Sequence, residues 1–433
     1  MNKEFIKRRK SLMRMIGHDG IAILPAASVK VRNRDVEYDY RQDSDFMYLT
    51  GFLEPEAVAV MVPGRKHGQF ILFCRDRDKE METWNGRRAG QEGVINDYGA
   101  DDAFPIGDID EILPGILEQR EKVFYTMGIN PEFDHRVIGW VNQIKEKARA
   151  GAHAPHEFIA LDHLLHELRL FKSGAEISKM KKAAKATIAG HKRAMQACSP
   201  GMYEYQVEAE LLYEFNKAGC GTAYPSIVGG GENGCILHYT ENNQILNDGD
   251  LLLIDAGAEY EGYACDITRT FPVCGEFTEA QLELYDLVLQ AQYAAIDATQ
   301  PGNHWNDPHH AAVKVLTKGM VKLGILKGQP AKLIKSGEYR KYYMHRTGHW
   351  LGLDVHDVGD YKIDEQWRLF EPGMVMTVEP GIYIPAKSRG VPKRYWNTGI
   401  RIEDDVRVTR NGNEVMTAGL IKEATDIEEF MAV

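Results

Sequence analysis

The chain has 433 residues, and ordinary domain sizes predict roughly two or three domains. Its composition, with 44% hydrophobic and 27% charged residues, excludes large-scale disorder. The formal net charge of −11 argues against a general nucleic-acid binder, because contacts to phosphates need clustered cations.

Six cysteines are too few for a disulfide framework in a chain of this length, and no CxxC pair that could form a zinc ribbon occurs. The first residues, MNKEFIKRRKSLMRMIGHDG, lack the apolar core of a secretion signal. No stretch reaches the ~20 apolar residues that a membrane span needs. We therefore expect a cytoplasmic protein with free thiols and no membrane partner.

The first part of the chain alternates patterns typical of strands and of helices. The three apolar runs of strand length and the two helical patterns lie at residues 20–25, 57–63, 69–74, 109–122 and 135–149. A segment dense in helix formers, residues 161–199, then marks the junction between two domains. Ser173 can cap a helix there, with Glu176 as its partner in a capping box. We expect an α/β domain over residues 1–172.

The second domain, residues 173–433, is predicted to be α+β, with helices packed over a mostly antiparallel sheet. Beyond residue 220 the sequence is typical of strands and turns, with helical patterns at 279–299 and 309–322. The run GGGENG at 229–234 matches GxGxxG, but the following CILHYTENN leaves no room for the helix that a dinucleotide site requires. We interpret this run as a tight loop.

Two aspartates occupy apolar strands of one predicted hairpin, in LLLIDAGAEYEGYACDITRTFPV. If its turn is centred between Tyr260 and Glu261, Asp255 and Asp266 face each other with Cβ atoms ~5 Å apart. Two like charges at that distance destabilise a sheet unless a cation lies between them. A metal ion is the favoured interpretation. The alternatives are that one aspartate caps a turn, or that the two share a proton.

The last third of the chain adds further candidate ligands. Three histidines fall within twelve residues of YMHRTGHWLGLDVHDV, namely His345, His349 and His356. Glu379 ends an apolar strand before a Pro-Gly turn. Arg401 and Glu403 are two residues apart and therefore share one strand face. An ion pair between these two at the surface remains the alternative for that segment.

Together these residues suit a site for two divalent ions. Four carboxylates and one neutral imidazole carry a charge of −4, which two divalent cations balance. Ligands that are mostly oxygen favour Mn²⁺, and Zn²⁺ or Co²⁺ remain alternatives. Paired ions can supply a hydroxide near neutral pH and polarise a carbonyl group.

With these segments in hand, the chain resembles aminopeptidase P, the Xaa-Pro aminopeptidases, which are pita-bread metallopeptidases related to prolidase and methionine aminopeptidase. The resemblance is carried by IVGGGENGCILHYTEN, LLLIDAGAEYEGYACDITRTFPV, HWLGLDVHDVG, EPGMVMTVEPGIYI and GIRIEDDV. In the N-terminal domain it is carried by YRQDSDFMYLTGFLEPEAV and WNGRRAG. It implies an aminopeptidase P N-terminal domain followed by a pita-bread catalytic domain.

The resemblance also implies roles for individual residues. The metal ligands it implies are Asp255, Asp266, His349, Glu379 and Glu403. Of these, Glu379 is also the implied general base, while His238, His356 and Arg401 complete the implied catalytic groups. The implied substrate-binding residues are His345, Tyr224, Tyr383 and Trp84. Bacterial relatives are often homodimers or homotetramers, so we expect a homo-oligomer.

The expected activity is that of a dinuclear-metal exopeptidase. It would hydrolyse the N-terminal Xaa-Pro bond through a metal-bridging hydroxide and release the first residue of peptides with proline in second position. The alternatives are a prolidase restricted to dipeptides, a methionine aminopeptidase and a non-catalytic peptide binder. Arg346 and Thr347 depart from the small or apolar residues common in bacterial members, which leaves the shape of the substrate pocket open.

Overall fold

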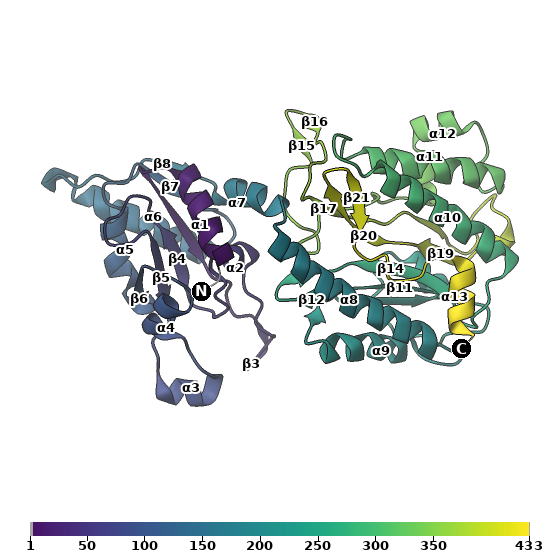
Figure 1. Ribbon diagram of the computed structural model, residues 1–433, viewed down its shortest axis with the longest axis horizontal. Coiled ribbons are helices and arrows are strands. Elements are labelled where there is room, and N and C mark those ends of the chain that lie inside the picture. The colour runs from purple at the N-terminus through teal and green to yellow at the C-terminus, as the bar shows by residue number, and fades with distance from the viewer. Residues whose placement is uncertain (1–2, 433) are drawn as a thin grey trace. The chain divides into compact units, whose positions relative to one another are not determined.

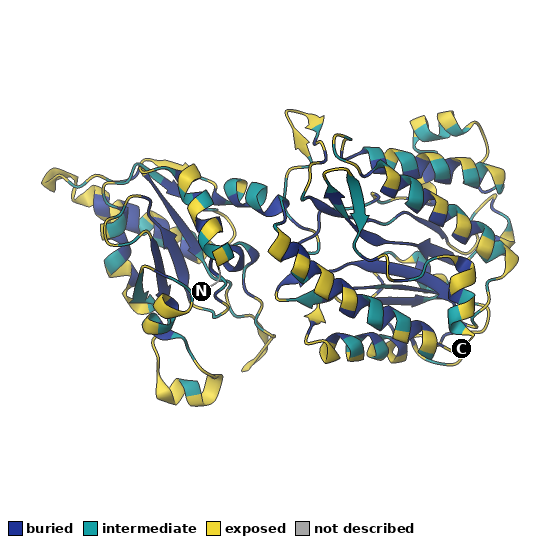
Figure 2. Cartoon of the chain, in the orientation of Figure 1, coloured by how far each residue is buried: buried dark blue, intermediate teal, exposed yellow. Residues whose placement is uncertain are grey.

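The computed structural model describes residues 3–432 and divides the chain into two compact units, Met1–Arg169 and Leu170–Val433 (Figure 1). The expected domain junction after residue 172 stays a prediction. In both units the strands are mostly buried, and the helices expose one face to solvent (Figure 2). Within the described residues, no helix combines the length and the apolar character that crossing a membrane requires.

The first unit is built on one six-stranded mixed sheet with the order β6-β5-β4-β1-β7-β8. The strands of this unit are β1 (Gly20–Pro25), β2 (Val31–Asn33), β3 (Val36–Glu37), β4 (Val58–Met61), β5 (Phe70–Cys74), β6 (Asp102–Pro105), β7 (Lys122–Phe124) and β8 (Glu157–Ile159). Its helices are α1 (Lys3–Ile16), α2 (Ser44–Thr50), α3 (Lys79–Asn85), α4 (Gly90–Asn96), α5 (Ile109–Leu117), α6 (Pro131–Glu146) and α7 (Leu161–Leu170), with short 3₁₀ turns at Ile106–Asp108 and Ala148–Ala150.

The apolar runs expected as strands form the centre of this sheet. The strands β1, β4 and β5 are antiparallel neighbours, whereas β7 and β8 continue the sheet in parallel beyond β1. Leu113 of α5 and Trp140 of α6 pack against Ile21, Val60 and Phe73 of the sheet. The helix expected over 109–122 is wrong beyond Leu117, because Gln119 has a positive φ and Lys122 begins β7.

The second unit places antiparallel strands between two pairs of helices (Figure 1). Its strands are β9 (Gly221–Thr222), β10 (Ile227–Gly230), β11 (Leu251–Ala256), β12 (Ala258–Tyr260), β13 (Tyr263–Ala264), β14 (Ile267–Pro272), β15 (Lys362–Ile363), β16 (Gln366–Trp367), β17 (Val375–Val378), β18 (Gly381–Ile384), β19 (Thr398–Arg401), β20 (Asp404–Thr409) and β21 (Gly412–Val415). Its helices are α8 (Gly174–Ala197), α9 (Glu204–Lys217), α10 (Glu279–Ala298), α11 (Asp307–Lys322), α12 (Pro330–Ser336) and α13 (Ala424–Met431), with 3₁₀ turns at Gly231–Cys235, Glu338–Lys341 and Lys393–Tyr395.

Helix α8 packs against β11, β12 and β14, whereas α10 packs against β17, β18 and β19. The two strand groups are joined by hydrogen bonds: the amide of Glu403 donates to the carbonyl of Thr268 at 3.0 Å, and the Thr270 hydroxyl donates to the carbonyl of Arg401 at 3.1 Å. The expected α+β architecture is confirmed. The glycine run at 229–234 leads only into a single 3₁₀ turn, as its interpretation as a loop requires.

Helix α8 begins at the capping box expected from the sequence. The Ser173 hydroxyl accepts the amide of Glu176, and the Glu176 carboxylate accepts the amide of Ser173 at 2.9 Å. Two amides that the helix cannot satisfy internally are therefore paired.

Replacing Ser173 by alanine should open the first turn of α8 about fivefold more often, equivalent to ~1 kcal/mol, because one capped amide loses its acceptor. Hydrogen exchange of the amides in residues 174–177, followed by mass spectrometry, measures this change. Ser178→Ala is the matched control, since the Ser178 hydroxyl bonds within the helix, to the carbonyl of Gly174. Equal exchange in the two variants would contradict the capping role.

Candidate metal centre

The ribbon formed by β11 and β14 supplies both aspartates of the predicted hairpin. Asp255 lies in β11 and pairs with Thr268, so the expected direct pairing of Asp255 with Asp266 is wrong by two residues. The turn is a two-residue one at Glu261 and Gly262, with φ values of 47° and 83°, as a type I′ turn requires. A shift of two residues keeps every side chain on its expected face, so the two carboxylates still approach each other diagonally.

The two strands of the ribbon approach each other closely at Gly257, between the two aspartates. A Cβ atom at Gly257 would lie 1.7 Å from the carbonyl oxygen of Cys265 on the opposite strand. The backbone approach that brings Asp255 and Asp266 to one place therefore depends on the absence of a side chain at this position.

A tyrosine joins the two aspartates. The hydroxyl of Tyr224 lies 2.7 Å from Oδ1 of Asp255 and 2.5 Å from Oδ1 of Asp266. Because a phenol has one proton to donate, it cannot satisfy both oxygens. The other oxygen of Asp255 accepts from Nη2 of Arg401 at 2.6 Å. Burial raises the pKa of Asp255, although Arg401 opposes the shift.

His349 faces the carboxylates through Nε2. Its Nδ1 donates to the carbonyl of Trp350 at 2.9 Å, while Nε2 lies 3.5 Å from Asp266 Oδ2 and 3.7 Å from Glu379 Oε1. Burial disfavours the imidazolium, but Asp266 and Glu379 outweigh it and raise the pKa of His349 to about 9. An imidazole held by a backbone carbonyl at one nitrogen presents the other nitrogen as a metal ligand.

Glu379 and Glu403 complete the cluster, and both lie at the ends of strands in the group formed by β17, β19 and β20. Glu379 directly follows β17, and burial raises its pKa to about 7. Glu403 lies between β19 and β20, where its Oε2 accepts the hydroxyl of Thr268 at 2.6 Å. Burial, reinforced by the facing Asp266, raises the pKa of Glu403 well above its ordinary value.

These side chains fit a site for divalent cations. Ligand atoms of Asp266, His349 and Glu403 all lie within 4.8 Å of one another, and the contacts above connect Asp255 and Glu379 to them. Asp266 and Glu403 are buried and Asp255 and Glu379 are partly buried, and Arg401 is the arginine that contacts this group of four carboxylates. The single proton of Tyr224 can satisfy only one of the two aspartates. Such a set is stabilised either by bound protons or by cations, and its oxygen-rich donors match hard divalent ions.

The cluster lies in a cleft of about 1230 Å³. Four expected pocket residues line it: Tyr224, His238, His345 and His356. Tyr383 is not among the lining residues. It is fully buried behind them, where its hydroxyl contacts His345 Nε2 at 2.8 Å and accepts from Arg401 Nη1 at 3.0 Å.

Trp84 belongs to the first unit, in α3, and 80% of its surface is exposed. Its expected part in substrate binding stays a prediction.

Several contributing residues escaped the sequence analysis. Thr268 donates to Glu403 and accepts from Arg401 Nε at 3.0 Å, and Thr377 accepts the amide of His349 at 3.1 Å. Thr268 could have been predicted, because it lies two residues after Asp266 and therefore on the same face of the strand. The cleft is also lined by Trp305, Tyr361 and Trp367, which no local pattern marks as pocket residues.

Both units of the chain match known protein families. Residues 178–410 match the model of metallopeptidase family M24, and residues 5–125 match that of the aminopeptidase P N-terminal domain. The chain is 45% identical over 431 residues to the Xaa-Pro aminopeptidase of Escherichia coli, covering 99% of this chain and 97% of that one.

Solved structures agree as well. The aminopeptidase PepP of Pseudomonas aeruginosa is 57% identical with a TM-score of 0.98, covering 99% of this chain and 98% of that one. Zinc-substituted aminopeptidase P of E. coli in complex with product is 44% identical with a TM-score of 0.96, covering 99% and 98% respectively.

Metal binding to the metal-free protein at pH 7 should release about two to three protons per chain, because ligands must lose their protons to bind metal. Glu379 with a pKa of about 7, His349 with one of about 9 and Glu403 with a raised pKa hold these protons beforehand. The apparent affinity therefore falls as the pH falls. Titration calorimetry in two buffers of different ionisation enthalpy counts the protons, and Glu403→Gln should release fewer. Heats that do not depend on the buffer would refute this.

Proposed function

Because this chain belongs to metallopeptidase family M24 and carries an aminopeptidase P N-terminal domain, we propose that it binds two divalent metal ions. The proposed ligands are Asp255, Asp266, His349, Glu379 and Glu403. The chain is a hydrolase of the Xaa-Pro aminopeptidase class, and it removes the N-terminal residue from peptides whose second residue is proline.

The observation that carries the dinuclear proposal is the group of four carboxylates, two buried and two partly buried, around the imidazole of His349. Three ligand groups lie within 4.8 Å of one another, and Tyr224 links the remaining aspartate to them. Bound metal ions would supply a nucleophile at neutral pH and polarise the carbonyl group of the scissile bond. We propose Mn²⁺ as the native metal because four of the five ligands are carboxylates, with Zn²⁺ and Co²⁺ as alternatives.

Glu379 is the proposed general base. Its two carboxylate oxygens lie near different histidines, with Oε1 3.7 Å from His349 Nε2 and Oε2 3.8 Å from His345 Nδ1. In this position it can take a proton from the attacking nucleophile and pass it to the proline nitrogen, which must be protonated as the bond breaks. The N-terminal amine of the substrate would lie beside Asp255, which restricts cleavage to the first bond.

Histidines at the cleft are the proposed substrate-orienting groups. His238 and His356 line the cleft with exposed rings, and the ring centroids of His356 and His349 lie 4.3 Å apart. His345 is different, because burial lowers its pKa to about 3 and it therefore stays neutral. We propose that His238 and His356 donate hydrogen bonds to the substrate carbonyl, whereas His345 and Tyr383 hold Arg401 against Asp255.

Two further parts of the proposal concern the environment of the enzyme. We propose a homodimer or homotetramer in which Trp84 contributes to substrate binding, which its exposure on α3 supports. A cytoplasmic location is proposed as well, because free cysteines are typical of reducing compartments.

Cleavage assays test the substrate class and the metal dependence together. After treatment with EDTA, the protein should cleave Ala-Pro-Ala at the Ala-Pro bond only when Mn²⁺ is restored, and it should leave Ala-Ala-Ala intact. Released alanine, measured by chromatography, is the readout. Cleavage of the dipeptide Ala-Pro alone would indicate a prolidase, and no metal-dependent cleavage of any peptide would overturn the assignment.

Glu379→Ala should lower kcat for Ala-Pro-Ala by at least ~100-fold, because the proton transfer loses its carrier. Metal content is measured on the same sample, since Glu379 is also a proposed ligand. Glu276→Ala, at an exposed glutamate of the same unit, is the control and should keep full activity. Near-normal activity of Glu379→Ala with its metal retained would eliminate the proton-carrier role.

A further inference from the structure

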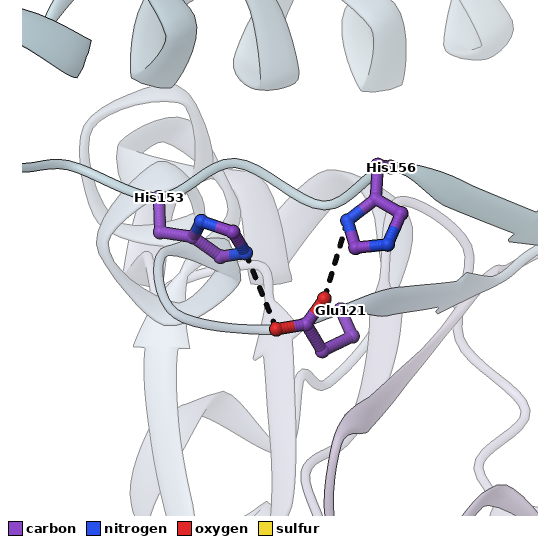
Figure 3. A group of neighbouring side chains, drawn as sticks. All are labelled: Glu121, His153 and His156. Atoms are coloured by element: carbon purple, nitrogen blue, oxygen red, sulfur yellow. Dashed lines mark ion pairs between the residues drawn. The ribbon is translucent and has the colours of Figure 1, made fainter.

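A second group of metal-ligand side chains lies in the first unit, outside the catalytic cleft. It consists of Glu121, His153 and His156 (Figure 3). One ligand atom from each lies within 4.8 Å of the others. His153 Nε2 is 3.2 Å from Glu121 Oε1, and His156 Nδ1 is 3.2 Å from Glu121 Oε2.

The backbone holds these three residues in place. Glu121 directly precedes β7 and His156 directly precedes β8, and these strands are parallel neighbours with Lys122 opposite Glu157. The amide of His156 donates to the carbonyl of Glu121 at 3.1 Å, and the amide of Gln119 donates to the carbonyl of His153 at 2.9 Å. Two backbone hydrogen bonds therefore tie the histidine loop to the segment that carries the glutamate.

The segment between the histidines turns both rings to the same side. Pro155 is buried and Ala154 packs against the core of the unit, whereas His153 and His156 are exposed. Figure 3 shows the two rings pointing from this loop toward the carboxylate of Glu121. The rings are thus kept out of the core and face solvent, from which an ion and its water ligands can arrive.

We propose that Glu121, His153 and His156 bind one Zn²⁺ ion, with water completing its coordination. Zinc–ligand bonds of about 2.0–2.1 Å place neighbouring ligand atoms of a tetrahedral site about 3.3 Å apart. Each histidine lies 3.2 Å from a different oxygen of Glu121, and one ligand atom from each of the three residues lies within 4.8 Å of the others, so small side-chain rotations would bring them to that spacing. Two imidazoles and one carboxylate are a common zinc ligand set with one position left open.

The ligand chemistry separates this site from the catalytic centre. Imidazole nitrogen suits Zn²⁺, Cu²⁺ and Ni²⁺, whereas carboxylate-rich sets suit Mn²⁺. The site has two imidazoles to one carboxylate, while the centre in the cleft has one imidazole to four carboxylates. Zn²⁺ bound here would join the start of β7 to the loop before β8, a link between segments more than 30 residues apart in sequence.

The test compares zinc binding by Mn²⁺-loaded protein with binding by two variants, His153→Gln/His156→Gln and Glu121→Gln. Zn²⁺ is titrated in competition with a chromophoric chelator. Wild-type protein should bind one equivalent more than the double variant, whose catalytic centre is unaltered. Glu121→Gln should bind that equivalent at least ~10-fold more weakly. The matched control, His163→Gln, removes an exposed histidine of the same unit and should bind as wild type.

Equal zinc stoichiometry in wild type and the double variant would overturn the proposal and leave the three residues as an ion-paired cluster. Wild-type affinity in Glu121→Gln would also overturn it, since the carboxylate would then not be a ligand. Circular dichroism checks that each variant is folded. Cleavage of Ala-Pro-Ala with Mn²⁺ should be unchanged in all variants, so failure of this site and failure of the catalytic assignment give different results.

Discussion

The mutual repulsion of carboxylates buried between two groups of strands is the constraint on which the second unit depends. Asp266 and Glu403 are almost fully buried, and Asp255 and Glu379 lie beside them in the cleft. Left to itself such a group would bind protons or pull apart, because burial penalises each charge and each charge penalises the others. Divalent cations remove both penalties at once.

The surroundings of the cluster fix the carboxylates without neutralising them. Tyr224 spans the two aspartates, Thr268 bonds to Glu403, and Arg401 reaches Asp255. Each of these groups sets the orientation of an oxygen, but together they bring only the one positive charge of Arg401 to four carboxyl groups. The centre is thereby organised in advance for ions that supply the missing charge.

Neighbouring acids in the sequence have opposite environments in this fold. Asp404 follows Glu403 directly, yet it points into a separate buried network with Arg269 at 2.8 Å and Lys422 at 2.7 Å. Burial opposes its charge, but these two cations hold its pKa well below the ordinary value, whereas the pKa of Glu403 is well above it. Adjacent residues of an extended segment point to opposite sides, which separates the ion-paired Asp404 from Glu403, a proposed metal ligand.

The sequence by itself determined the two-domain organisation, the central strands of the first unit, the capping box of α8 and the family, because these depend on local patterns and ordered motifs. It also placed Asp255 and Asp266 on one face, since the period of two in a strand survives an error of two residues in register.

Only the tertiary structure decided that Asp255 pairs with Thr268, that Tyr224 bridges the aspartates and that Trp350 orients His349. It alone also brought Glu121 to His153 and His156. Most of these contacts join segments that are distant in the chain, and the others depend on which backbone group a side chain bonds to. The packing of the whole unit selects them, and no local spacing in the sequence encodes that packing.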